Sequence, residues 1–173
     1  MLKSTSDAVT KIKQLVLLSR TPEDEVLLLA RMGRWRWTMN QRDITFSDNL
    51  YTIFDLDRNH FLPTLNGLQT LVSTRDMGRI FITINRLIQD GQEGVIDFTL
   101  KHPKHKESEY FVRCYVCAER DDAGQTIALY GLLQDITREK RNQTALQHAL
   151  EETEAANRAK SRFLATMSHE LRT

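Results

Sequence analysis

Long apolar segments are missing from this 173-residue sequence. The longest uncharged apolar runs are 26–30 (VLLLA) and 127–133 (IALYGLL), whereas a helix that crosses a bilayer needs about 20 such residues. The N-terminus carries Lys3, Lys11 and Lys13 but no apolar block followed by a cleavage site of small residues, so it lacks the pattern of a secretory signal. We therefore expect no membrane segment in this sequence, and a cytoplasmic location.

A strong net charge is also missing. The chain has 24 Lys+Arg and 23 Asp+Glu, a formal net charge of +1, so no overall field draws it to nucleic acid or to an anionic membrane. The stretch Arg34–Trp37 (RWRW) interleaves cations with aromatic rings, as surfaces that bind single-stranded nucleic acid do. On a strand, however, the two tryptophans lie on one face and the two arginines on the other. We predict that the tryptophans pack in the core or in a dimer, and we expect no nucleic-acid partner.

Cysteine and histidine are scarce. The two cysteines, Cys114 and Cys117, fall in a predicted strand, where residues three apart point to opposite faces, so they cannot readily form a redox-active pair. A metal needs several converging ligands, yet His102 and His105 lie in a polar connector (HPKH) and His60 is far from both in the sequence. We expect no metal site.

The N-terminal region shows helical periodicity. In residues 6–19 one helical face carries Val9, Ile12, Leu15 and Val16, which predicts an amphipathic helix. A second helix is predicted over 22–32, because Thr21 can act as the N-cap, Pro22 occupies the first helical position and three acidic residues follow. Gly33 lies just past the expected end of this helix.

Strand-like alternation follows in several segments. Residues 34–48 are typical of a hairpin, and residues 49–72 contain short apolar groups that suit two or three brief helical turns. Three longer strand-like runs come later and are joined by polar connectors: 94–101, 108–119 and 126–136. This order predicts an α+β fold with a five-stranded antiparallel sheet and flanking short helices.

A longer helix is predicted before the last three strands. Ser73 can cap it, Asp76 occupies the capping-box position three residues on, and Gly91 follows its end. Its apolar face consists of Ile80, Ile84, Leu87 and Ile88.

Glycine and proline are absent from the last 36 residues, where good helix formers dominate. Alternating steps of four and three residues pick out a heptad seam that is apolar at both ends and polar in the middle: Leu146, Leu150, Thr153, Asn157, Lys160, Leu164, Met167 and Leu171. This seam predicts a coiled coil and a homodimer, with the N-terminal helix as a second dimer contact. Polar residues in a seam fix one register or permit two.

Four motifs in order resemble a PAS sensor domain over residues 22–137. They are GRWRWTMN at the first strand, SDNLYTIF after the second, STRD at the start of the long helix, and DDAGQTIALYGLLQDIT at the last strand. The resemblance implies the PAS fold. It also implies that Asp135 and Thr137 form a signal-transmitting junction, in which the carboxylate holds the strand end and the hydroxyl caps the outgoing helix. Any Asp-x-Thr sequence would cap a helix equally well.

The resemblance also bears on a ligand of the sensor. Haem-binding PAS domains carry an axial histidine on the long helix, and 75–90 contains none. Light-sensing PAS domains need a cysteine in the turns before that helix, and GLQTLVSTRD contains none. We therefore expect neither haem nor flavin-thiol chemistry, and the ligand is unknown. A small apolar metabolite in a cavity beneath the sheet and a purely structural domain without a cavity are equal alternatives.

The tail FLATMSHELRT resembles the H-box of sensor histidine kinases. This implies that His169 is the phosphoacceptor, which attacks the γ-phosphate of ATP, and that Glu170 acts as general base. It also implies phosphotransfer to an aspartate of a response regulator or receiver domain. The heptad count places Met167 at a d position and His169 at f, facing away from the seam.

The chain ends at Thr173, one residue before the proline that usually follows in this family, so we expect a fragment of a longer kinase whose ATP-binding domain is missing. Such a fragment is expected to be inactive alone, and its parent could be membrane-anchored upstream. The alternative is a non-catalytic PAS module for dimerisation or ligand binding that scaffolds a partner. The expected organisation is an N-terminal helix or linker (1–21), a PAS sensor domain (22–137), a coiled-coil signalling helix (138–160) and the start of the phosphoacceptor domain (161–173).

Overall fold

The computed structural model describes residues 22–39, 43–90, 93–102, 104 and 108–172. The chain divides into two units, Met1–Ile136 and Thr137–Thr173. The helix expected at 6–19 and the cap expected at Thr21 lie outside the described residues.

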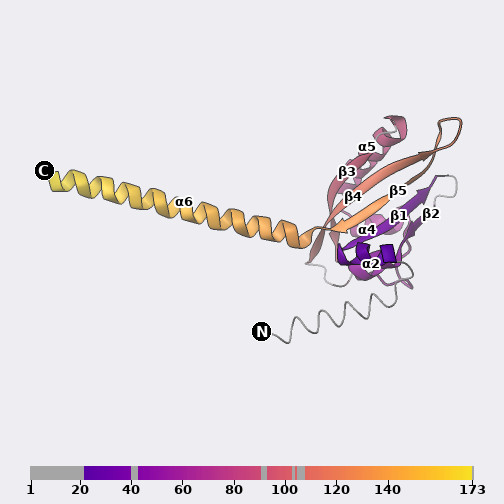
Figure 1. Ribbon diagram of the computed structural model, residues 1–173, viewed down its shortest axis with the longest axis horizontal. Coiled ribbons are helices and arrows are strands. Elements are labelled where there is room, and N and C mark those ends of the chain that lie inside the picture. The colour runs from indigo at the N-terminus through magenta and orange to yellow at the C-terminus, as the bar shows by residue number, and fades with distance from the viewer. Residues whose placement is uncertain (1–21, 40–42, 91–92, 103, 105–107, 173) are drawn as a thin grey trace. The chain divides into compact units, whose positions relative to one another are not determined.

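The first unit is built on an antiparallel five-stranded sheet, in the order β2-β1-β5-β4-β3 (Figure 1). Its strands are β1 (Met32–Thr38), β2 (Asp43–Phe46), β3 (Gly94–Lys101), β4 (Glu109–Arg120) and β5 (Thr126–Asp135). The predicted sheet and the predicted hairpin are therefore confirmed. The second strand was expected to continue to Asp48 but ends at Phe46, because Asp48 already begins a helix. Ser47 stays tied to β1 through a hydrogen bond from its N–H to the Arg34 carbonyl (2.9 Å).

In the described part of the first unit, the sheet is accompanied by the helices α2 (Pro22–Leu29), α3 (Asp48–Ile53), α4 (Leu65–Leu71) and α5 (Thr74–Asp90). The short helices α3 and α4 confirm the brief helical turns expected between 49 and 72. Figure 1 shows α5 running beside β3 at the edge of the sheet.

Helix α2 is shorter than the predicted 22–32. It ends at Leu29 because Arg31 adopts a left-handed backbone conformation (φ 54°), which no helix continues through, and Met32 already belongs to β1. Gly33 lies within β1 rather than after a helix. A Cβ at Gly33 would lie 2.6 Å from the side chain of Leu50, so glycine is needed there for α3 to approach the strand.

The start of α5 confirms Ser73 as its cap, since the Asp76 N–H donates to the Ser73 hydroxyl (3.2 Å). The Asp76 carboxylate, however, was expected to complete a capping box and has other partners. It accepts hydrogen bonds from the Thr99 N–H of β3 (3.1 Å) and from Arg79 (3.1 Å). Asp76 therefore fastens the long helix to the sheet.

The core lies on the inner face of the sheet, which α3, α4 and α5 cover. Strand β4 alternates as predicted: Val112, Cys114 and Val116 are buried, whereas Cys117 lies on the opposite, outer face. The largest fully buried side chains are Phe54, Leu50, Leu129, Ile136 and Val112.

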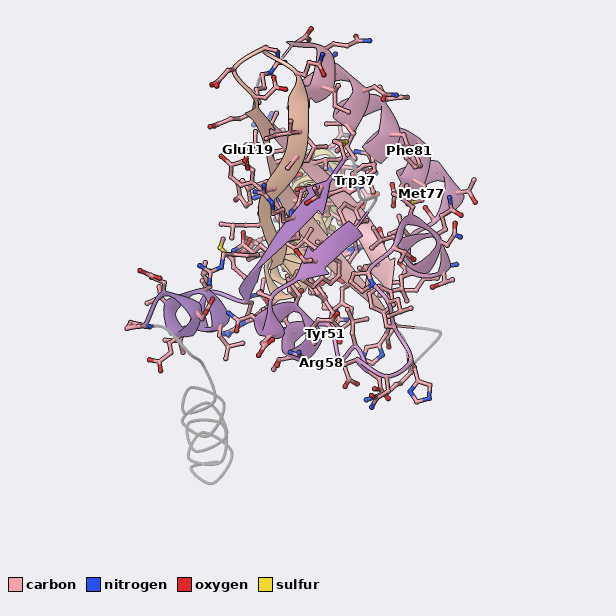
Figure 2. All side chains as sticks on the ribbon, turned by 90° about the vertical axis from the view of Figure 1, so that its right-hand side faces the viewer. Trp37, Tyr51, Arg58, Met77, Phe81 and Glu119 are labelled. Carbon is pink, nitrogen blue, oxygen red and sulfur yellow. The ribbon has the colours of Figure 1, made fainter. Side chains whose placement is uncertain are left out.

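The RWRW stretch also divides as predicted. Trp35 and Trp37 pack against the core on the inner face. Arg36 lies on the outer face and pairs with Glu119 of β4 (2.7 Å). Figure 2 shows Glu119 on the opposite side of the sheet from Met77 and Phe81 of α5. The two arginines and two tryptophans therefore do not form one surface.

The second unit is the helix α6 (Thr137–Arg172), which is unbroken over the predicted glycine- and proline-free segment. Among the residues that the structure describes, no helix combines the length and the apolar content that a bilayer span requires.

Candidate functional site

An ion pair holds the end of the last strand. The guanidinium group of Arg31 binds the carboxylate of Asp135, with its Nε 2.9 Å from Oδ2 and one terminal nitrogen also in contact. The backbone strengthens this contact, because the Asp135 N–H donates to the Arg31 carbonyl (3.0 Å). The Asp135 side chain is only 4% exposed, whereas that of Arg31 is 51% exposed. A buried carboxylate is thus held by a partner that reaches it from the surface.

The residues next to this pair are held by a backbone hydrogen bond and by burial. The Ile136 N–H donates to the Phe111 carbonyl (2.8 Å), and the Ile136 side chain is buried. Burial, and to a lesser degree the nearby Asp135 carboxylate, raises the pKa of Tyr110 in β4. Thr137 is buried and is the first residue of α6.

The turn that carries Arg31 is itself anchored. The buried Asn49 donates from its side-chain amide to the Asp24 carbonyl (2.7 Å) and to the Met32 carbonyl (3.4 Å). The Asp24 carboxylate pairs with Arg34. Helix α3 is therefore hydrogen-bonded to both elements that flank the Arg31 turn, helix α2 and strand β1.

His169 and Glu170 are consecutive residues in the last turn of α6, and both are exposed. The apolar seam residues of this helix are exposed as well: the exposed fraction is 39% for Met167, 52% for Leu150 and 82% for Leu171. A helix that exposes such a stripe is typical of one that packs against another helix.

A cavity of about 80 Å³ lies between the inner face of the sheet and helices α4 and α5. Figure 2 shows Trp37 on the sheet side of this region, with Met77 and Phe81 of α5 near it. Cys114 also lines the cavity, and burial raises the pKa of its thiol to about 12. In the described part of the chain, no group of three or more His, Cys, Asp or Glu side chains is placed to hold a metal ion.

No family model matches the chain. Two curated relatives do. The chain is 50% identical over 48 residues to hybrid signal transduction histidine kinase I of Dictyostelium discoideum, which covers 28% of this chain and 3% of that protein. It is 32% identical over 112 residues to an uncharacterized sensor-like histidine kinase of Rhizobium meliloti, which covers 64% of this chain and 21% of that protein. The chain therefore spans at most about a fifth of the length of these relatives.

Solved structures show the same fold at low identity. A sensory box histidine kinase/response regulator from Burkholderia thailandensis superposes with a TM-score of 0.61 at 15% identity, over 78% of this chain and 98% of that one. The N-terminal domain of a diguanylate cyclase with a PAS/PAC sensor from Marinobacter aquaeolei gives 0.55 at 16% identity, over 63% and 98%. The sheet and its helices have the PAS fold. Together with the kinase relatives, this supports a fragment of a PAS-domain sensor histidine kinase.

Of the predicted site residues, the PAS domain contains Asp135 at the end of its last strand, and Thr137 begins the next unit. His169 and Glu170 lie far along α6, and their roles stay predictions. Sequence reasoning missed Arg31 completely. Its only sequence signal is its place just before the first strand, and that signal becomes useful only once β1 is known to pair with β5.

Proposed function

We propose that this chain is the sensory and signal-transmitting part of a two-component histidine kinase, in which the PAS domain controls autophosphorylation of His169. The observation that carries the proposal is the carboxylate of Asp135, buried and held by Arg31 just before α6 begins. A helix that carries an H-box motif thus starts directly after a fixed strand end. The PAS fold and the histidine kinase relatives support the same reading.

In this proposal, a signal received by the PAS domain alters the Arg31–Asp135 contact and the strand end beside it. The helix seam has polar residues in its middle, Thr153, Asn157 and Lys160, which permit two packings of similar energy. A shift between these packings changes how His169 is presented to the ATP-binding domain of the parent protein. Dimerisation through α6 makes the two helices respond together.

The chemistry proposed for α6 is phosphoryl transfer. ATP, held by another domain of the parent protein, supplies the γ-phosphoryl group. A lone pair on one imidazole nitrogen of His169 attacks the γ-phosphorus, the bond to the bridging oxygen breaks, and ADP leaves. The Glu170 carboxylate accepts the proton from the other ring nitrogen. The phosphoryl group then passes to an aspartate of a response regulator or receiver domain, in the cytoplasm.

The test is to measure incorporation of radiolabel from [γ-³²P]ATP into the full-length parent protein and its variants. His169→Gln is expected to abolish labelling. His148→Gln is the matched control, because His148 is also an exposed histidine on α6 but lies outside the H-box motif. Labelling of the His169→Gln variant at the wild-type level would show that the phosphoacceptor is elsewhere.

A second measurement tests the junction. Asp135→Asn keeps the shape of the side chain but removes its charge, so we expect the basal autophosphorylation rate to change while His169 still becomes labelled. A rate equal to that of the wild type would show that the charge of Asp135 does not control the kinase reaction.

A further inference from the structure

The outer face of helix α5 carries positive charge around one exposed apolar side chain. Residues three and four positions apart share a helix face, and this spacing forms one exposed ridge: Arg75, Arg79, Ile82 and Arg86. Ile82 is 70% exposed. In α5, which the structure describes throughout, the acidic residues are Asp76, which is buried, and Asp90, which ends the helix. The exposed ridge is therefore basic along its length.

Gly78 leaves a notch beside this ridge. A Cβ at Gly78 would meet no atom within 4 Å, so packing within the described chain does not require glycine there. Glycine weakens a helix interior relative to alanine, but it leaves room for another backbone to approach closely. A partner that packs on the outside of α5 would explain why the chain keeps glycine at this position.

Helix α2 exposes a surface of the opposite charge. Val26 is 65% exposed and Leu29 is 61% exposed, and the two residues lie on the same side of the helix. Glu23 and Glu25 flank them, and no residue within this fully described helix is basic. The surface of α2 is thus apolar with carboxylates at its edges, whereas that of α5 is apolar with guanidinium groups at its edges.

These two surfaces cannot meet within one chain, because α2 and α5 lie well apart on the first unit (Figure 1). We propose that α2 of one chain packs on the outer face of α5 of a second copy. Apolar residues then meet at the centre of the contact, and opposite charges meet around it, which is the usual arrangement of a protein interface.

An antiparallel arrangement of the two helices brings three pairs of residues together. The pairs are Val26 with Ile82, Leu29 with Gly78, and Glu23 with Arg86. When the first pair is the centre, the other partners lie three residues away on α2 and four residues away on α5. At 1.5 Å per residue these steps are about 4.5 Å and 6 Å, so the spacings on the two helices match closely. Leu29 enters the notch at one end, and an ion pair forms at the other.

This contact is heterologous, because each chain offers its α2 to one neighbour and its α5 to another. It can therefore join more than two chains, whereas the predicted seam of α6 pairs two. Helix α2 has only 8 residues, so the contact is small, and we expect a dissociation constant between about 1 μM and 1 mM. The contact does not depend on the kinase function proposed above.

The experiment measures self-association of the chain by sedimentation equilibrium. All samples carry Leu150→Lys, which weakens the α6 seam, so the remaining association reports the contact between α2 and α5. Glu23→Arg and Arg86→Glu should each raise the dissociation constant at least about tenfold, because each places like charges opposite one another. An equimolar mixture of these two variants should associate to within about threefold of the chain without them, since each then meets the opposite charge on the other.

Two further variants locate the contact. Arg75→Glu is the matched control, because it reverses the same charge on the same helix but lies about 10.5 Å from Ile82, past the end of α2 in the antiparallel arrangement. Its dissociation constant should stay within about threefold of the unchanged value. Gly78→Ala should leave the fold intact by circular dichroism, because its Cβ meets no atom of its own chain, yet weaken association at least about threefold.

Three results would overturn the proposal: no association of the Leu150→Lys chain up to about 1 mM, equal effects of Arg75→Glu and Arg86→Glu, or a mixture that associates no better than its separate components. All of these are measured without ATP. A failure of His169 labelling therefore leaves them unaffected, and a failure of this contact leaves the phosphoacceptor assignment unaffected.

Discussion

The exposed Arg31 and the buried Asp135 are 104 residues apart and close the same end of the sheet, joined by side-chain and backbone hydrogen bonds. Because the carboxylate is buried, removing its cation leaves a desolvated charge without its main partner. We expect Arg31→Gln and Asp135→Asn each to lower the free energy of unfolding by about 1–3 kcal/mol, measured by urea denaturation. In the double variant, the loss in the free energy of unfolding should be much smaller than the sum of the losses in the two single variants.

The pair Arg34–Asp24 is the internal control for this prediction. It also joins a half-exposed arginine to an aspartate near α2, but the Asp24 side chain is 20% exposed, against 4% for Asp135. A double-mutant cycle with Arg34→Gln and Asp24→Asn should give a coupling of only about 0–1 kcal/mol. Equal coupling energies in the two cycles would show that burial of the Asp135 carboxylate does not strengthen its ion pair.

Two glycines should respond to alanine in opposite directions. A Cβ at Gly131 of β5 would lie 1.8 Å from the Tyr115 carbonyl oxygen of β4, so the two central strands would have to separate. We expect Gly131→Ala to destabilise the chain by more than about 4 kcal/mol or to prevent folding. Gly78→Ala meets no atom and should stabilise it by about 0.5–1 kcal/mol. Urea denaturation followed by circular dichroism measures both, and a stabilising Gly131→Ala would show that the two strands lie farther apart.

Cys114 should make the stability of the domain depend on pH in the alkaline range. The unfolded thiol ionises near its ordinary pKa of 9.0, whereas burial raises the pKa of the folded thiol to about 12. The stabilising contribution is therefore complete below pH 9 and is lost as the pH rises toward 12. The loss for this group is at most about 1.4 kcal/mol per pH unit.

Variants separate the contribution of Cys114 to the pH dependence from that of lysines and tyrosines, which titrate in the same alkaline pH range. Between pH 9 and 11, the free energy of unfolding of Cys114→Val should fall less steeply than that of the wild type. Cys117 lies on the outer face, and burial raises its pKa as well, but Cys117→Val should flatten the curve less because that thiol is more accessible. Identical curves for the wild type and Cys114→Val would contradict the assignment.

Most of the fold was predictable because its strands alternate and its helices have a clear period. The alternation of Trp35 and Trp37 with arginines, and of buried and exposed residues in β4, directly reports a half-buried sheet. The end of α2 was not predictable, because the left-handed conformation falls on Arg31, a residue type that gives no sign of it. Asp76 has the spacing of a local cap, but its carboxylate binds the Thr99 N–H, 23 residues away, and Arg79.

The candidate site was predictable only where it is local in sequence. Asp135, Thr137, His169 and Glu170 stand in recognisable short motifs. Arg31 belongs to no motif, and its role depends on β1 lying next to β5. The cavity depends on how α4 and α5 pack on the sheet, which residue types alone do not determine.

The seam of α6 should hold two copies of the chain together. In the single chain, Leu150 is 52% exposed, although it occupies an a position of the predicted heptad. A lysine there would place two charges at the centre of a parallel coiled coil, so Leu150→Lys should weaken dimerisation by at least about tenfold in the dissociation constant, measured by sedimentation equilibrium.

His148→Lys is the matched control, because the same lysine then occupies an f position two residues away, on the side of the helix opposite the seam. Its dissociation constant should stay within about twofold of the wild-type value. Asn157→Leu should strengthen the dimer, since it replaces a polar seam residue by an apolar one. By the proposed mechanism it should also favour one of the two packings, and so reduce the response of the full-length kinase to its signal. If Leu150→Lys and His148→Lys changed the dissociation constant equally, the dimer contact would lie outside this seam, and control of His169 through the seam would be ruled out with it.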